Sequence, residues 1–207
     1  NHPKVDGAAR RQAADGSCFN GPTARWVELA ERLVALTPWA HWSVFAKNGS
    51  DVVTWATQVA REATGRKRIL AAEGAYHGTH AWCSPMPGGL TPEDRVNVVR
   101  YRYNDLASVD AALTAHHDDV AAIVVSPFRH DAFHDQEMAA PGFFAGLRAR
   151  CDRIGAALVL DDVRAGFRLD LRGSGEAVGV TPDLTCYCKA LGNGYPIAAA
   201  LGTDALR

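Results

Sequence analysis

Residues 156–162 have the sequence AALVLDD, an apolar run that ends in two aspartates. A continuous apolar run of this length predicts a strand that is covered on both faces, as in parallel sheets. The segment 120–126, VAAIVVS, has the same character. Amphipathic segments lie between and before these two runs. The sequence therefore predicts an α/β domain with a largely parallel sheet.

Three helices are expected around these strands. Apolar residues at helical spacing predict two of them over 23–36 and 51–64, and a third over 144–154. Pro141 is expected in the first turn of the third helix, and Gly155 at its end. Further strands are predicted at 68–72, 95–101, 183–188 and 197–201.

Composition narrows the function classes. The 207 residues carry 22 basic and 23 acidic side chains, a formal net charge of −1. This balance gives no reason to expect nucleic acid or a membrane as a partner. No apolar run approaches a membrane span, and the first residues lack a signal-peptide core, so a cytoplasmic protein is expected. The five cysteines form no CxxC pair, which favours reduced thiols.

A lysine follows one of the predicted strands. Lys189 comes after the strand 183–188 and before the turn Gly192-Asn193-Gly194. Ligands of open α/β sheets bind beyond the carboxyl ends of the strands. A lysine amine that is partly desolvated there becomes a nucleophile, because its pKa falls. The alternative is a surface lysine that opens a turn.

Two carboxylates follow another strand. Asp161 and Asp162 stand at the carboxyl end of the run 156–160. A buried carboxylate needs a cation or several donors nearby, and a protonated pyridine nitrogen is such a cation. The alternative is a helix cap or an ion pair with Arg164 or Arg168.

The helix expected at 51–64 begins with a potential phosphate site. Asn48, Gly49 and Ser50 precede it. Free backbone N–H groups and the helix dipole bind phosphate at such a place, and Gly49 lets the backbone approach closely. An ordinary N-cap by Asn48 or Ser50 is the alternative.

An aromatic residue follows the strand expected at 68–72. Tyr76 belongs to the run Tyr76-His77-Gly78. Its ring could stack on a flat cofactor, with packing in the core as the alternative.

The segment 127–140 is rich in His, Asp and Arg and is predicted to be a loop. Arg129 could meet a substrate carboxylate, or it could form ion pairs within the loop. His130 and His134 have the i, i+4 spacing that suits a metal on a helix, and no metal site is expected in a loop. Two further candidates for the substrate pocket are Ser126 and Trp82, a residue that could equally pack in the core.

Together these features resemble the class III aminotransferases, which depend on pyridoxal 5'-phosphate (PLP) and have fold type I, particularly their glutamate-1-semialdehyde aminomutase branch. The resemblance implies a three-layer α/β/α large domain over residues 1–207, with a mostly parallel sheet. Compared with the family, residues 1–207 are expected to lack the N-terminal arm and the small C-terminal domain. The stretches that carry the resemblance are 45–51, 64–66, 76–78, 161–168, 180–184 and the loop of Lys189.

The resemblance implies a reaction and two catalytic residues. Lys189 would hold PLP as an internal aldimine, and Asp161 would pair with the pyridine nitrogen. The enzyme would transfer the amino group of an amine or amino acid, and it would be a homodimer with shared active sites.

The resemblance also places further residues around the cofactor. Val163 and Tyr76 would pack on the two faces of the ring, and Gly49 and Ser50 would hold the phosphate. Arg164 would lie near the phenolic oxygen, and His77 would belong to the same site beside Tyr76.

The chain departs from the family pattern at three places. Ser126 stands where the family has a glutamate, Asp162 replaces the glutamate of D-E-V, and Asn193 interrupts G-G-G. Because of these departures, three reaction types remain as alternatives: amino transfer, intramolecular amino transfer by an aminomutase, and epimerisation. A non-catalytic binding protein with this fold is a further alternative, against which Lys189 argues. A nucleotide-binding domain is disfavoured, because neither GxGxxG nor GxxxxGK[ST] occurs.

Overall fold

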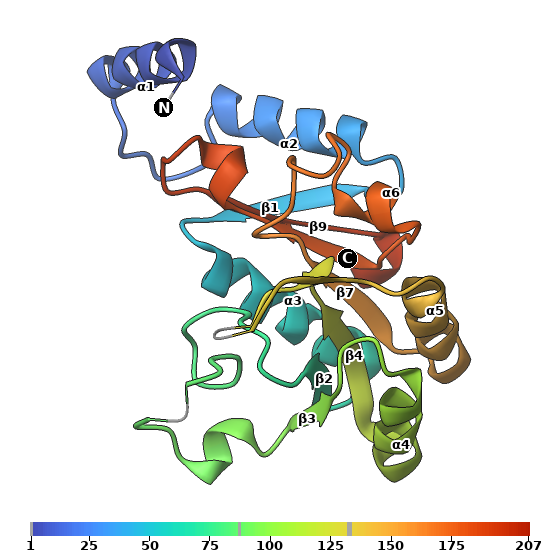
Figure 1. The fold of residues 1–207 in the computed structure, drawn as a ribbon. Helices are drawn as coiled ribbons and strands as arrows, with labels where there is room; N and C mark the ends of the chain where they lie inside the picture. Colours follow the sequence, from blue (N-terminus) through green and yellow to red (C-terminus); the bar gives the residue numbers. More distant parts are fainter. Residues whose placement is uncertain (1, 87, 132–133) are drawn as a thin grey trace.

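The structure, a computed structural model, describes residues 2–86, 88–131 and 134–207. Within them lies a seven-stranded sheet of order β1-β9-β8-β7-β4-β2-β3 (Figure 1). The strands from β8 to β3 are parallel to one another, whereas β9 is antiparallel to both of its neighbours. The strands are β1 Trp42–Ala46, β2 Arg68–Ala72, β3 Val98–Tyr101, β4 Val120–Val125, β7 Ala157–Asp161, β8 Leu184–Tyr187 and β9 Ala198–Gly202.

Helices cover both faces of the sheet, which confirms the three-layer prediction. Helix α3 (Gly49–Thr64) lies on one face, and α4 (Leu106–His116) and α5 (Phe143–Ile154) lie on the other (Figure 1). Alternation along β4 explains this arrangement, since successive side chains of a strand point to opposite faces. Ile123 and Val125 belong to the core cluster of α4 and α5, and Ala122 and Val124 belong to that of α3.

The remaining elements lie at the edges. Helix α2 packs through Leu33 against Tyr187 and Leu201, whereas α1 buries no residue and stands apart in Figure 1. No helix in the described ranges has the length and apolar character needed to cross a membrane. These elements are α1 Pro3–Asp15, α2 Ala24–Leu36, α6 Ser174–Val178, the 3-10 helices Pro92–Arg95, His117–Asp119, Lys189–Gly192 and Asp204–Leu206, and the hairpin strands β5 Phe128–Arg129 and β6 Glu137–Met138.

Most predicted elements are confirmed within a few residues, with two corrections. The segment 127–140, predicted to be a loop, contains the paired strands β5 and β6. Pro141 does not lie in the first turn of α5, because Gly142 is the N-cap residue, with φ 83°, and the helix begins at Phe143. Gly155 ends α5 in the left-handed conformation, as predicted. The described residues at 130–131 and 134–136 lie outside helices, so the helical spacing of His130 and His134 does not apply.

Candidate active site

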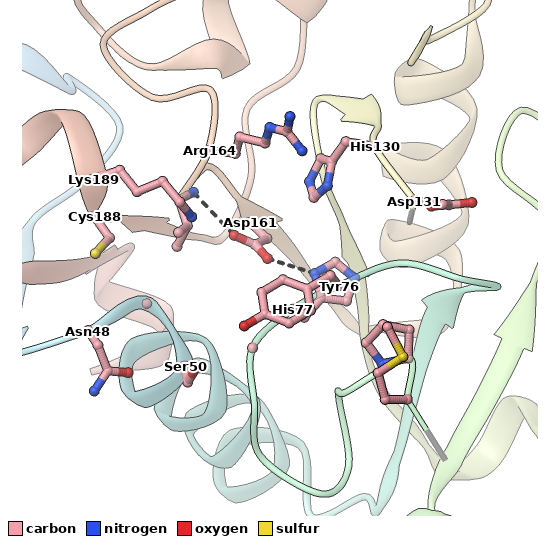
Figure 2. A pocket seen from close by; sticks show the side chains of 15 residues that line it. Asn48, Ser50, Tyr76, His77, His130, Asp131, Asp161, Arg164, Cys188 and Lys189 are labelled. Atoms are coloured by element: carbon pink, nitrogen blue, oxygen red, sulfur yellow. Dashed lines mark hydrogen bonds and ion pairs between the residues drawn. The ribbon is translucent and has the colours of Figure 1, made fainter. Parts of the chain in front are cut away.

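A cavity of about 680 Å³ lies at the carboxyl ends of β7 and β8, where the sequence predicts ligand binding. Its walls come from the start of α3, the segment after β2, the segment after β4 and the two strand ends (Figure 2). All eight residues that the sequence assigns to the cofactor line this one cavity: Gly49, Ser50, Tyr76, His77, Asp161, Val163, Arg164 and Lys189.

The backbone at Lys189 is strained. Its φ is 38°, a left-handed conformation that non-glycine residues rarely adopt. The strand β8 ends at Tyr187, and a 3-10 turn begins at Lys189, closed by a 2.9 Å bond from the Leu191 N–H to the Cys188 carbonyl. The side chain of Lys189 extends into the cavity toward Asp161 (Figure 2). Strain of this kind persists where the surrounding structure fixes a residue for function.

Asp161 and His77 form a buried pair at the base of the cavity. Oδ2 of Asp161 lies 2.7 Å from Nδ1 of His77, and their side chains are 6% and 0% exposed. Oδ1 accepts a bond of 3.2 Å from the Val163 N–H. Because an ionised carboxylate only accepts, Nδ1 of His77 is the donor. The carboxylate of Asp161 is held by these two bonds and also lines the cavity.

Asp162 has a different role from its neighbour. Its side chain is fully buried, and its Oδ2 accepts a bond of 2.7 Å from the backbone N–H of Ser174, the first residue of α6. Burial raises the pKa of Asp162 to about 6. Asp162 thus accepts the first N–H of α6, whose N-cap residue is Gly173, and neither aspartate pairs with Arg164 or Arg168 among the contacts of the described residues.

The start of α3 forms a cradle. Asn48 is the N-cap residue, and its Oδ1 accepts the Asp51 N–H, as the N-cap alternative expected. The N–H groups of Gly49 and Ser50 have no partner within the helix, because they belong to its first turn. A Cβ on Gly49 would lie 2.8 Å from a methyl carbon of Val163, so only glycine fits without movement.

Tyr76 and Val163 lie on the walls of the same cavity. Tyr76 is 43% exposed, and its ring projects into the cavity beside His77 (Figure 2). Val163 lies directly after the two aspartates and against Gly49. The structure therefore brings an aromatic ring, an aliphatic side chain, a carboxylate and an amine around one space.

The three residues that the sequence suggests for the substrate pocket do not line this cavity. The guanidinium of Arg129 pairs with Asp131 at 2.5 Å and with Glu137 at 3.6 Å and does not line the cavity, so the ion-pair alternative holds for it. Trp82 donates from Nε1 to Thr54 and packs against the core beside α3. Ser126 is buried and also absent from the walls.

Seven lining residues were not assigned to the cofactor from the sequence: Asn48, Gly78, Pro85, Met86, His130, Asp131 and Cys188. His130 and Asp131 follow the strand 120–125, and Cys188 directly precedes Lys189. Their positions just beyond strand ends are the signal that could have found them. Burial lowers the pKa of His130, which therefore favours the neutral imidazole.

The class-III aminotransferase family matches residues 1–207. The chain belongs to this family. Its cofactor is PLP, which agrees with the residues gathered around the cavity.

Two proteins named as aminotransferases are similar to this chain over nearly all of its length. The aminopentol aminotransferase of Sphingopyxis macrogoltabida is 45% identical over 204 residues, 99% of this chain and 48% of that protein. The 3-aminobutyryl-CoA aminotransferase of Cloacimonas acidaminovorans is 36% identical over 202 residues, 97% and 48% of the two chains. The chain thus spans about half the length of these relatives.

Solved structures are also similar to this chain over all or nearly all of its length. The FumI protein of a Sphingopyxis species, in its PLP internal aldimine form, has a TM-score of 0.94 at 44% identity, over 100% of this chain and 50% of that one. A glutamate-1-semialdehyde aminomutase from Pseudomonas aeruginosa has a TM-score of 0.87 at 25% identity, over 99% and 47%. The fold is therefore shared with a protein that holds PLP as an internal aldimine and with an aminomutase.

Proposed function

We propose that the full-length protein is a PLP-dependent aminotransferase, and that Lys189 is the residue to which the cofactor is attached. The observation that carries this proposal is the convergence of Lys189, Asp161, Tyr76 and the start of α3 on one cavity. The family membership supports it.

The residues present fit the cofactor. Among the residues that the structure describes, His77 and one backbone N–H donate to the buried Asp161, and a pyridinium would supply a positive partner. The first turn of α3 offers unpaired N–H groups for a phosphate, and the absence of a side chain at Gly49 keeps that turn against Val163. Tyr76 and Val163 supply the apolar surfaces that a flat ring needs.

Each residue has a definite task in this proposal. When bound, PLP draws electrons from the substrate carbon that carries the amine. Asp161 would hold the proton on the ring nitrogen, with His77 fixing the carboxylate from behind. Gly49 and Ser50 would bind the phosphate, and Nζ of Lys189 would move the proton at the substrate carbon.

We further propose transfer to a second molecule, an oxo acid, in preference to the aminomutase or epimerase reaction. Two relatives with 45% and 36% identity are named aminotransferases, whereas the aminomutase structure is 25% identical. The name of the first relative suggests an aliphatic amine as the donor. The test is conversion of an amine with and without added pyruvate. Amine consumption that requires pyruvate is expected, and equal turnover without it would favour the aminomutase or the epimerase.

We propose that residues 1–207 form the cofactor-binding large domain of a homodimer with shared active sites. The extent of the relatives, about twice that of this chain, supports a further domain. Sedimentation of the full-length protein should give twice the mass of one chain. A monomer with full activity would contradict this proposal.

A further inference from the structure

Two cavities meet at Lys189. The second has a volume of about 690 Å³ and is lined by the hairpin β5–β6 and by the turn that follows β7. Arg164 and Lys189 line both cavities. If a substrate reacts at Lys189, as the proposed function requires, the second cavity is a space into which its other atoms extend.

The second cavity is rich in positive charge. Arg164, Arg168 and Lys189 line it, and Glu137 is the acid among its lining residues. Glu137 is already paired, since its Oε2 lies 3.6 Å from a guanidinium nitrogen of Arg129. The cavity therefore favours an anion.

Two guanidinium groups there are free of acids. Arg168 donates to the backbone oxygen of Arg164, and the guanidinium of Arg164 lies 6.0 Å from the centre of the Phe128 ring. Within residues 2–86, 88–131 and 134–207, neither arginine has a carboxylate partner. An arginine beside a cavity and without an acidic partner is available for a ligand anion.

Arg129, the candidate chosen from the sequence, is not available in this way. Its hydrogen bond to Asp131, a side chain only 4% exposed, raises the pKa of Arg129 and keeps its guanidinium engaged. The positive charge of Arg129 is thus satisfied within the hairpin, whereas that of Arg164 is not.

The same cavity has an apolar wall. Phe128, Met138 and Leu169 line it, and the latter two are 60% and 42% exposed. A short carbon chain that ends in a carboxylate matches an apolar wall followed by guanidinium groups.

We propose that the second cavity is a carboxylate subsite, in which Arg164 binds the carboxylate of the oxo-acid acceptor and Arg168 adds a second positive charge. This inference rests on the proposed function. It makes Arg164 a residue that selects the acceptor, because a neutral carbonyl compound of the same length gains nothing from it.

The test compares 4-oxobutanoate with butanal as acceptors for the full-length holoenzyme, because a carboxylate replaces a methyl group between them. In Arg164→Gln, kcat/KM for 4-oxobutanoate should fall about 10- to 100-fold more than for butanal, mainly through KM. The control Arg25→Gln changes an arginine that is 75% exposed and pairs with Glu28, and it should leave the ratio unchanged.

Equal losses for both acceptors, with a shifted pH titration of the bound cofactor's absorbance, would overturn the proposal and place Arg164 at the cofactor. Calorimetry with propanoate gives a readout without turnover. Binding about 10-fold weaker in Arg164→Gln supports the subsite, and unchanged binding overturns it. A wild-type protein that binds propanoate through Arg164 but transfers no amine would refute the proposed function alone.

Discussion

Nδ1 of His77 lies 2.7 Å from Oδ2 of Asp161, and both side chains are buried at the base of the cavity. The two residues are 84 positions apart, on the segment after β2 and at the end of β7. The imidazole thus fixes the orientation of the carboxylate that faces the cavity.

Replacement of His77 tests this pairing. His77→Phe leaves Asp161 with a single backbone donor, so the free energy of unfolding should fall by about 1–3 kcal/mol. Urea denaturation of the full-length protein measures the change. The control His41→Phe alters a histidine whose side chain is 49% exposed, and it should have a much smaller effect. Equal losses in the two variants would show that the pair is not stabilising.

Asp161→Asn tests the role of the carboxylate toward the cofactor. The amide keeps the size of the side chain but loses its negative charge, so PLP affinity should fall about 10- to 100-fold. Titration of apo-protein with PLP, followed by absorbance, measures the change. An unchanged affinity would remove Asp161 from the cofactor site.

Gly49→Ala tests the close approach of α3 to Val163. The new Cβ would lie 2.8 Å from a methyl carbon of Val163, and overpacking of this kind costs about 1–3 kcal/mol of stability. The double variant Gly49→Ala, Val163→Ala removes the obstructing methyls and should recover part of the loss relative to the sum of the single variants. Strict additivity in thermal or urea unfolding would contradict the contact.

The buried Asp162 predicts a specific pH dependence. Its pKa is about 6 in the folded protein, above the ordinary 3.8, so the folded state holds the proton more tightly than the unfolded chain. The contribution of this group to the free energy of unfolding is therefore fully present below about pH 4 and is lost as pH rises through 6, by on the order of 3 kcal/mol.

Asp162→Asn removes this titration while keeping an oxygen that can accept the Ser174 N–H. Unfolding measured from pH 4 to pH 7 should show the wild type losing stability relative to the variant up to about pH 6, and a constant difference above that. Parallel curves over the whole range would show that burial does not raise this pKa.

The positions of the site residues at strand ends could be predicted, because each depends on a single strand that the local sequence pattern identifies. The apolar runs that become β7 and β8 end at Asp161 and just before Lys189, so both side chains were placed from local pattern alone. The helix α1 was missed because none of its residues is buried, and it therefore shows no apolar periodicity.

The sequence could not show which arginine, Arg129 or Arg164, lines a cavity and which is paired with acidic side chains. This difference depends on the pairing of Arg129 with Glu137 across the hairpin, a register set by two short strands without an apolar pattern. The placement of the Trp82 side chain likewise depends on a residue distant in sequence, Thr54, whose hydroxyl accepts a hydrogen bond from the indole N–H.

The central claim is that Lys189 carries the cofactor, and borohydride trapping of the full-length protein incubated with PLP tests it most directly. Peptide mapping by mass spectrometry should locate the reduced cofactor on Lys189. The variant Lys189→Ala should lose the label, whereas Lys67→Ala, which changes an exposed lysine, should keep it. Labelling of another lysine in the wild type, or undiminished labelling of Lys189→Ala, would contradict the account.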